Sequence, residues 1–359
     1  MVALEIVSRE NVVCIKKDNE LVRPLSRLSW IDRLLPIWIL LSMATGLLIG
    51  NYGGENVKDL GHIHIAGVSL PIAIGLWMMM LPVLVKVRYE ILPHLLTEPA
   101  MAKQVAISSI LNWLVGPAMM TLLAWICLPD LENLRNGVIL VGLARCIAMV
   151  LIWNDLAMGN RELCAVLVAL NSILQVVLYT PFTLFYLNIV SHTSIHVGFW
   201  PVARSVLLFL GVPLAGGVGL RYAIWAIKGK DWLNHTFIPY FSPIALLSLL
   251  YTIVIMFASQ GEKITHQALS VVRVSVPLLL YFGIMFFSSL AISKRHRMES
   301  SEAITQAFTA TGNNFELAIA IAVATFGIDS DEAFAATIGH LIEVHALLGL
   351  AYIYLWWKQ

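Results

Sequence analysis

Three ionisable residues, Arg145, Glu316 and Glu343, lie within long apolar stretches of this 359-residue sequence. If those stretches cross a membrane, a charge at the centre of a helix costs on the order of 2.5–3.5 kcal/mol on insertion scales. Charged residues persist at such positions where they have a partner or a task, so each is a candidate for transport or proton transfer. The alternative is an ion pair between Arg145 and Glu316 that serves packing alone.

A polar string, Thr311-Gly312-Asn313-Asn314-Phe315-Glu316, interrupts one of the apolar stretches. Glycine lowers helix propensity, and asparagine side chains can bond the backbone groups that a break sets free. Glu316 would then lie in the first turn of the following half-helix, where the positive end of the helix dipole favours a carboxylate. A polar break at bilayer depth is tolerated where it is buried or faces a water-filled cavity. The string therefore predicts a binding or coupling site.

Cys146 directly follows Arg145. A neighbouring guanidinium favours the thiolate form of cysteine, and a soft thiolate suits a thiophilic metal or metalloid. Adjacency alone favours the simpler interpretation, because buried free cysteines usually pack as small hydrophobic residues. We assign that structural role to Cys14, Cys127 and Cys164, which lie in the N-terminal stretch or near the ends of apolar segments.

The last apolar segment carries His340, Glu343 and His345. His340 and Glu343 are three residues apart and therefore share a helix face, which permits a metal site or a proton relay. Two ligands on one helix are a weak metal signal, and the sequence contains no zinc-type CxxC pair. We expect no metal and no cofactor here, and we keep Glu343 as the alternative to Glu316 for proton coupling.

The composition is that of an integral membrane protein. Hydrophobic residues make up 59% of the chain and charged residues only 13%, whereas soluble domains are about half apolar and a quarter charged. The net charge of +1 carries no signature of nucleic-acid binding. The sequence has no HExxH, GxSxG or nucleotide-binding motif, so a transporter is favoured over an enzyme.

Ten apolar segments, each about as long as the roughly 20 residues that a membrane-spanning helix needs, follow one another along the chain. They cover residues 34–50, 65–85, 101–127, 136–153, 163–190, 203–227, 238–259, 273–292, 301–327 and 332–357. With residues 1–33 inside, 17 of the 23 Lys and Arg residues fall on the inner side, 5 on the outer side, and Arg145 within a span. Because cytoplasmic connections are rich in basic residues, we predict an all-α protein of the cell membrane with a cytosolic tail over 1–33 and both termini cytosolic.

Two polar strings border the fourth and fifth segments. Trp153-Asn154-Asp155 ends the fourth, and Asn160-Arg161-Glu162 begins the fifth. Tryptophan favours the membrane interface, and asparagine is a common residue at helix N-termini. We expect interfacial and capping roles for these strings.

The two halves of the chain are related by a shift of 168 positions. This shift places Arg145-Cys146 on Asn313-Asn314 and Gln175 on Glu343 without a gap between them. Because each half contains an odd number of spans, five, the second copy must be inverted in the membrane. Inverted repeats with interrupted helices that meet at the midplane are typical of secondary transporters. We predict repeats over 34–190 and 191–359, with chance similarity between apolar helices as the alternative.

At these same residues the sequence resembles the Acr-type arsenite-efflux permeases, a branch of the bile acid/sodium symporter superfamily. The resemblance covers nearly everything after the first 33 residues. The strings that carry it are Leu81-Pro82 through Lys86-Val87-Arg88-Tyr89-Glu90, the run from Gly142 to Ala157, Leu170-Asn171-Ser172-Ile173-Leu174-Gln175, the run from Thr311 to Ala320, and Glu332-Ala333-Phe334-Ala335-Ala336.

The resemblance implies ten helices in two inverted five-helix repeats. A panel of spans 1, 2, 6 and 7 would face a core of the others, with broken spans 4 and 9 crossing. It also implies export of trivalent arsenite, and in some members antimonite, driven by the proton gradient. The family's essential cysteine falls on Cys146 and its essential glutamate on Glu316, which favours a functional Cys146. Arg145, Asn313 and Asn314 complete the expected substrate site.

The sequence departs from the family pattern in the last span. Where the family reads Gly-Pro-Leu-Val-Glu-Val-Pro, this chain reads Gly339-His340-Leu341-Ile342-Glu343-Val344-His345. Loss of two helix-bending prolines is expected to straighten this span.

Two other functions remain as alternatives. One is a sodium-coupled importer of organic anions, and the other is an inactive or receptor-like homologue. Cys146 argues against the importer, because an organic anion needs no thiol, and the presence of both Cys146 and Glu316 argues against loss of function.

Overall fold

The computed structural model describes residues 34–53, 64–65, 67–92, 97–194 and 196–358. The predicted cytosolic tail over residues 1–33 lies outside them. From the N-terminus the elements are α3 (Leu35–Tyr52), β1 (His64–Ile65), β2 (Val68–Ser69), α5 (Leu70–Lys86), η3 (Tyr89–Ile91), α7 (Pro99–Ile110), η4 (Leu111–Val115), α8 (Gly116–Cys127), α9 (Glu132–Leu143), α10 (Met149–Leu156), α11 (Arg161–Thr183) and η5 (Leu184–Val190). They continue with α12 (Phe199–Val206), η6 (Leu207–Gly211), α13 (Val212–Lys228), α14 (Lys230–Trp232), η7 (Leu233–Phe237), α15 (Ile238–His266), α16 (Ala268–Arg295), α17 (Ser300–Thr311), α18 (Phe315–Phe326) and α19 (Asp331–Lys358).

The predicted all-α membrane class is confirmed. Among the described residues, 6 continuous helical stretches are long and apolar enough to cross a membrane. They are Pro99–Cys127, Arg161–Val190, Phe199–Lys228, Lys230–Gly261, Ala268–Arg295 and Asp331–Lys358. The first and second predicted segments form shorter apolar helices, α3 and α5. The fourth and ninth are each divided into two half-helices, α9 with α10 and α17 with α18.

Local chemistry explains where several of these helices begin and end. Asn160 caps α11, because its side-chain oxygen accepts the backbone N–H groups of Glu162 and Leu163 at 3.0 and 3.1 Å. At the start of α17, Glu299 and Glu302 form a reciprocal capping box. α19 runs without a break from Asp331 to Lys358, as expected for a span without the two prolines.

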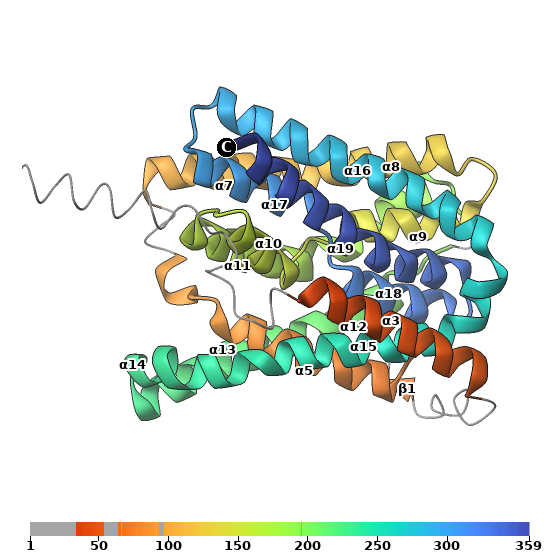
Figure 1. Cartoon of the computed structure of the whole chain (residues 1–359), viewed down its shortest axis with the longest axis horizontal. Coiled ribbons are helices and arrows are strands. Elements are labelled where there is room, and N and C mark those ends of the chain that lie inside the picture. The colour runs from red at the N-terminus through yellow and green to blue at the C-terminus, as the bar shows by residue number, and fades with distance from the viewer. Residues whose placement is uncertain (1–33, 54–63, 66, 93–96, 195, 359) are drawn as a thin grey trace, which may run out of the picture.

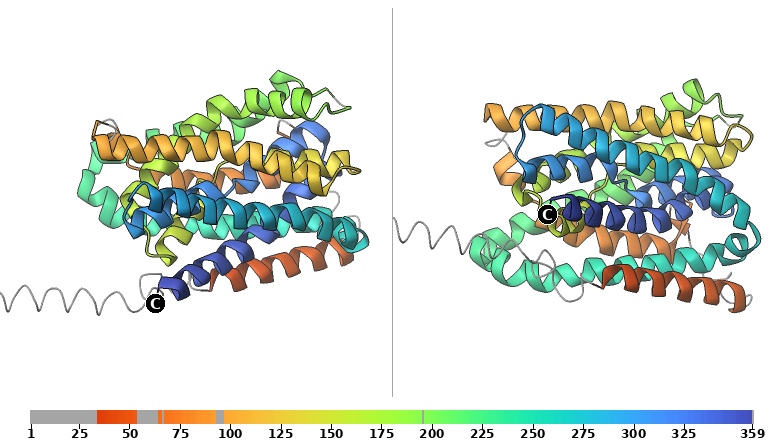
Figure 2. Two further views of the ribbon diagram at one scale, coloured as in Figure 1. Left: turned by 90° about the horizontal axis from the view of Figure 1, so that it is seen from above. Right: turned by 45° about the horizontal axis from the view of Figure 1, so that its top comes forward.

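The helices form two groups that pack face to face. In one group α15 packs on α3 and α5, and α13 packs on α5; in the other, α16, α17, α18 and α19 pack with α8 and α9. The first group lies along the lower side of Figure 1, and the second lies above it (Figures 1 and 2). Glycine makes the contact between α3 and α15 close, since a Cβ at Gly46 would lie 2.6 Å from the carbonyl oxygen of Val254. Such small-residue contacts are typical of membrane helices.

A buried ion pair links α13 to the segment that follows α5. The guanidinium of Arg221 is fully buried and donates from Nη2 and Nε to the two carboxylate oxygens of Glu90, at 2.7 and 3.1 Å. Its Nη1 also donates to the carbonyl oxygen of Val85 at 3.0 Å. Burial alone would raise the pKa of Glu90, but the hydrogen bonds and charge of Arg221 lower that pKa below its usual value.

Replacing Glu90 by glutamine is expected to destabilise the protein by about 3 kcal/mol, because a buried charge loses its partner. Since the folded pKa of Glu90 is depressed, the stability that the pair contributes is present above about pH 4.5 and is lost as the pH falls through the lowered value. The difference between wild type and Glu90→Gln in thermal unfolding in detergent should therefore be large at pH 7 and shrink below pH 4.5. Asp130→Asn, which breaks an exposed pair with Arg273, is the control and should change little. An equal effect of the two variants at pH 7 would contradict the role of the buried pair.

The ends of the helices provide a test of orientation. In Figure 1 the C-terminus and α14 lie toward one end of the molecule, and β1 lies toward the other. The charge pattern predicts that the end with the C-terminus is cytosolic. A reporter enzyme that works only in the cytosol should be active when fused after Gln359. Activity of a fused reporter on the outer side alone would contradict the predicted orientation.

Candidate functional site

The two interrupted helices meet at their breaks. The segment after Leu143 runs antiparallel to the segment after Thr311, and Arg145 and Asn313 form an isolated β-bridge. The backbone N–H of Cys146 donates to the carbonyl oxygen of Gly312 at 3.3 Å, and that of Asn314 donates to the carbonyl oxygen of Ala144 at 3.2 Å. Backbone groups freed by each break therefore find partners in the other break, which is what non-helical backbone at membrane depth requires.

Each break is also held by one side chain from a long helix. The backbone N–H of Arg145 donates to the side-chain oxygen of Gln175 on α11, and that of Asn313 donates to Oε1 of Glu343 on α19 at 3.1 Å. The shift of 168 positions that relates the two halves of the sequence converts the first contact into the second. Glu343 therefore does for one break what a neutral amide does for the other.

The Arg145 side chain is bonded to groups other than Glu316. Its fully buried guanidinium donates from Nη1 to the hydroxyl of Tyr281 on α16 at 3.0 Å and from Nη2 to the carbonyl oxygen of Gly142. Gly116 leaves space for this guanidinium, because a Cβ at position 116 would lie 2.6 Å from Nη1 of Arg145. The structure thus does not form the Arg145–Glu316 ion pair considered above, and the guanidinium is engaged in bonds to α16 and α9.

Cys146 is buried in the crossing, with 2% of its surface exposed. A Cβ added at Gly312 would lie 3.0 Å from the Cβ of Cys146 and 3.4 Å from its sulfur, so glycine gives the thiol its room. Cys164 is buried in α11, Cys127 is half-buried at the end of α8, and Cys14 lies outside the described residues. Among the described cysteines, Cys146 is the one at the crossing.

Glu316 lies in the first turn of α18, as predicted. Asn314 caps this half-helix by accepting the backbone N–H of Leu317 at 3.1 Å. Oε1 of Glu316 lies 3.8 Å from Nδ1 of His340 on α19, and both side chains are buried. The sequence indicated His340 through its spacing from Glu343, but not its place beside Glu316.

A cavity of about 310 Å³ lies between α5 and α15 on one side and α10 on the other. Met79 and Val83 of α5, Leu246 and Leu249 of α15, and Ala148 with Met149 at the start of α10 line it. Ala148 and Met149 follow Cys146 by two and three residues, so the cavity reaches the chain just beyond the crossing.

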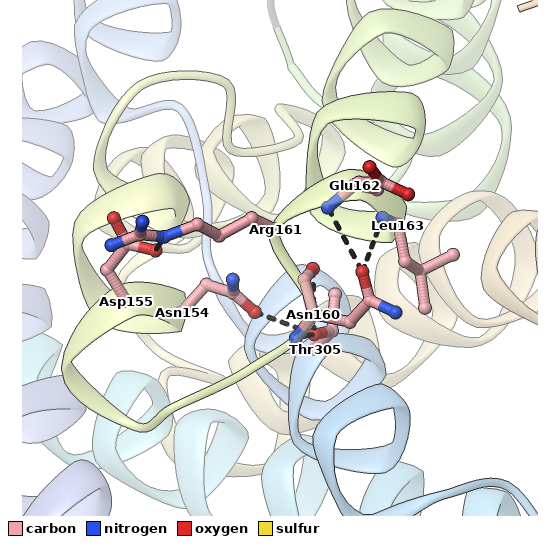
Figure 3. Close-up of polar contacts among 7 residues, drawn as sticks. All are labelled: Asn154, Asp155, Asn160, Arg161, Glu162, Leu163 and Thr305. Carbon is pink, nitrogen blue, oxygen red and sulfur yellow. Dashed lines mark hydrogen bonds and ion pairs between the residues drawn. The ribbon is translucent and has the colours of Figure 1, made fainter. Parts of the chain in front are cut away.

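The turn between α10 and α11 is fastened to α17 (Figure 3). The hydroxyl of Thr305 on α17 donates to the side-chain oxygen of Asn154 at 2.7 Å and accepts the backbone N–H of Asn160 at 2.8 Å. Arg161 forms an ion pair with Asp155 at 2.6 Å across the same turn (Figure 3). The predicted capping role of Asn160 is confirmed, and these contacts join one half of each interrupted helix.

A multi-pass helical protein with two broken helices that cross at a buried polar site is built as a transporter. The chain belongs to the Sodium Bile acid symporter family, whose model matches residues 73–267. It is 47% identical over 337 residues to the arsenical-resistance protein Acr3 of Corynebacterium glutamicum, a match that covers 92% of this chain and 90% of the relative. The arsenical-resistance protein Acr3 of Alkaliphilus metalliredigens is 31% identical, over 91% of this chain and 92% of its own. The protein is therefore a transporter and not an enzyme.

Proposed function

We propose that this protein exports trivalent arsenite, and also antimonite, from the cytosol in exchange for protons. The observation that carries the proposal is the crossing itself, which buries one thiol, Cys146, beside the half-helix that bears Glu316. The similarity to two arsenical-resistance proteins over nine-tenths of their length supports the substrate.

The proposed substrate site consists of Cys146, Arg145, Asn313, Asn314 and Glu316. Trivalent arsenic is a soft centre that prefers sulfur ligands. The Cys146 thiol and As(OH)₃ form a sulfur–arsenic bond, and the thiol proton leaves with one hydroxide as water. Hydrolysis of that bond on the other side restores the thiol and As(OH)₃. Arg145 acts through its bond to Tyr281 by holding the broken segment in place.

Glu316 is the proposed coupling residue in preference to Glu343. One oxygen of Glu343 accepts the Asn313 backbone N–H, a task that Gln175 performs for Arg145 without a charge. Oε1 of Glu316 has no hydrogen-bond partner among the described residues. A carrier drives its cargo uphill only if proton and cargo bind in competition, so a carboxylate that has an unbonded oxygen beside the proposed substrate site is suited to the role.

Alternating access would move the second helix group against the first. The cavity opens along the first half of α15, whereas near the other end of α15 Lys263 lies 2.5 Å from the carboxylate of Asp331. Gln260 also donates to the carbonyl oxygen of Ile328 there at 3.1 Å. This asymmetry supports a state open toward one side and closed at the other, and the paired contacts at the breaks support two inverted five-helix repeats over 34–190 and 191–359.

A sodium-coupled symporter of organic anions is the second candidate, since the family is named for sodium and bile acid. The two functions are separated by expressing the protein in cells that lack arsenite efflux. Lower cell-associated arsenic, independent of external sodium, supports the proposed exporter. Unchanged arsenic together with sodium-dependent uptake of an organic anion would contradict it, and no transport of either would favour an inactive homologue.

A further inference from the structure

His340 is held firmly beside the proposed substrate site. Its side chain is buried, with 4% of the residue exposed, and its ring packs edge-on against Phe315 with centroids 6.0 Å apart. Gly339 lets α19 approach this closely, because a Cβ there would collide with the Phe315 ring. Phe315 begins α18 and directly precedes Glu316, so the contact fixes His340 relative to the first turn of α18.

Four buried polar atoms around this first turn have no hydrogen-bond partner in the described part of the chain. They are Glu316 Oε1, His340 Nε2, Asn314 Nδ2 and Asn313 Oδ1. Buried polar atoms in folded proteins are nearly always bonded, so each exception requires an explanation such as a bound ligand or water. The set mixes acceptors with a donor, and an imidazole nitrogen can take either role according to its tautomer.

Resting on the function proposed above, we propose that His340 is a further substrate-binding residue, which hydrogen-bonds a hydroxyl group of a trivalent metalloid hydroxide held by Cys146. After one hydroxide of As(OH)₃ has left as water, the metalloid keeps two hydroxyls, and each hydroxyl can donate and accept. Unbonded donors and acceptors in a buried site fit such a ligand. They fit a carboxylate less well, because the Glu316 carboxylate would repel it.

The charged and titratable groups that face this site come from several elements. Glu316 lies on α18 and Glu343 lies on α19. Cys146 lies in the segment between α9 and α10. The hydroxyl of Tyr281 on α16 donates to the carbonyl oxygen of Ala310. The proposed role of His340 needs a hydrogen bond and no change in its charge, so the test is carried out at one pH.

The test compares arsenite uptake by everted membrane vesicles at pH 7.5 for three variants. His340→Leu should raise KM for arsenite about tenfold, since loss of one hydrogen bond of about 1.4 kcal/mol corresponds to that factor, while the maximal rate stays within about twofold. His340→Gln, which keeps an N–H donor and an acceptor, should recover part of the lost affinity. The matched control is His345→Leu on the same helix. His345 is exposed, and its Nδ1 is bonded to the Leu341 carbonyl oxygen at 2.8 Å. The KM of this control variant for arsenite should equal that of wild type.

A structural role gives a different result. If His340 only packs on Phe315, His340→Leu keeps its KM, or both variants lose maximal rate without a change in KM, and the inference is wrong. Equilibrium binding of arsenite to the purified variants provides the second measurement, and equal affinity of wild type and His340→Leu would overturn the inference. Wild-type vesicles that accumulate no arsenite would instead overturn the proposed function itself, which distinguishes the two failures.

Discussion

Replacement of Cys146 by serine is expected to reduce arsenite export to the level of vesicles without the protein, while the protein remains in the membrane. A serine hydroxyl is a hard ligand and cannot form the sulfur–metalloid bond. Serine is also close to cysteine in size, so the tight packing against Gly312 should survive. Arsenite uptake by everted vesicles measures the effect, and the amount of protein in the same membranes shows that folding is intact.

The other cysteines supply the matched control for this prediction. Cys164 is as buried as Cys146 but lies on α11, away from the crossing. A variant with Cys14, Cys127 and Cys164 all replaced by serine should export arsenite at a rate similar to wild type. Normal export by Cys146→Ser, or an inactive triple variant that is present in the membrane in normal amount, would show that the metalloid ligand is wrongly assigned.

Glu316→Gln is expected to lose proton-driven export and to retain arsenite binding. Glutamine keeps the size of the side chain and its hydrogen-bonding oxygen but cannot exchange a proton. Formation of the sulfur–arsenic bond releases water and no free proton, so proton release on binding must come from another group. Purified wild type should release protons when arsenite is added in weakly buffered solution, and Glu316→Gln should not. Glu316→Asp, which keeps the acid, should retain part of the release.

Glu343→Gln tests whether Glu316, and not Glu343, couples proton exchange to export. Because Gln175 holds the Arg145 backbone with an amide, an amide at position 343 should hold the Asn313 backbone equally well. Proton release and export should therefore persist in Glu343→Gln. Release that is lost in Glu343→Gln but intact in Glu316→Gln would transfer the coupling role to α19.

The break in the ninth span could be predicted from sequence, and the break in the fourth could not be derived in the same way. Gly312, Asn313 and Asn314 are poor helix formers, so they mark a break by their own chemistry. The chain between Leu143 and Met149 contains no glycine or proline, and its crossing followed only from the family resemblance. Its non-helical form depends on hydrogen bonds to the other break and to Gln175, which are tertiary contacts that a local pattern does not contain.

The contacts of the side chains within the site could not be predicted from the sequence either. Adjacency suggested that Arg145 acts on Cys146, but the guanidinium reaches Tyr281 on a helix far along the chain. Spacing grouped His340 with Glu343 on one helix face, whereas packing of α19 on α18 also brings His340 to Glu316. Composition and periodicity determine which residues are buried in helices. Which neighbours those residues meet depends on how the helices cross.

Proton-coupled export of arsenite can be measured with the wild-type protein in everted membrane vesicles. Arsenite is added without a starting concentration gradient across the membrane. The vesicles are then energised so that protons accumulate inside. We expect arsenite to accumulate in the lumen against its concentration gradient. A protonophore should abolish this accumulation, and sodium should have no effect on it. Accumulation that survives the protonophore, or that requires a sodium gradient, would show that export is not coupled to protons.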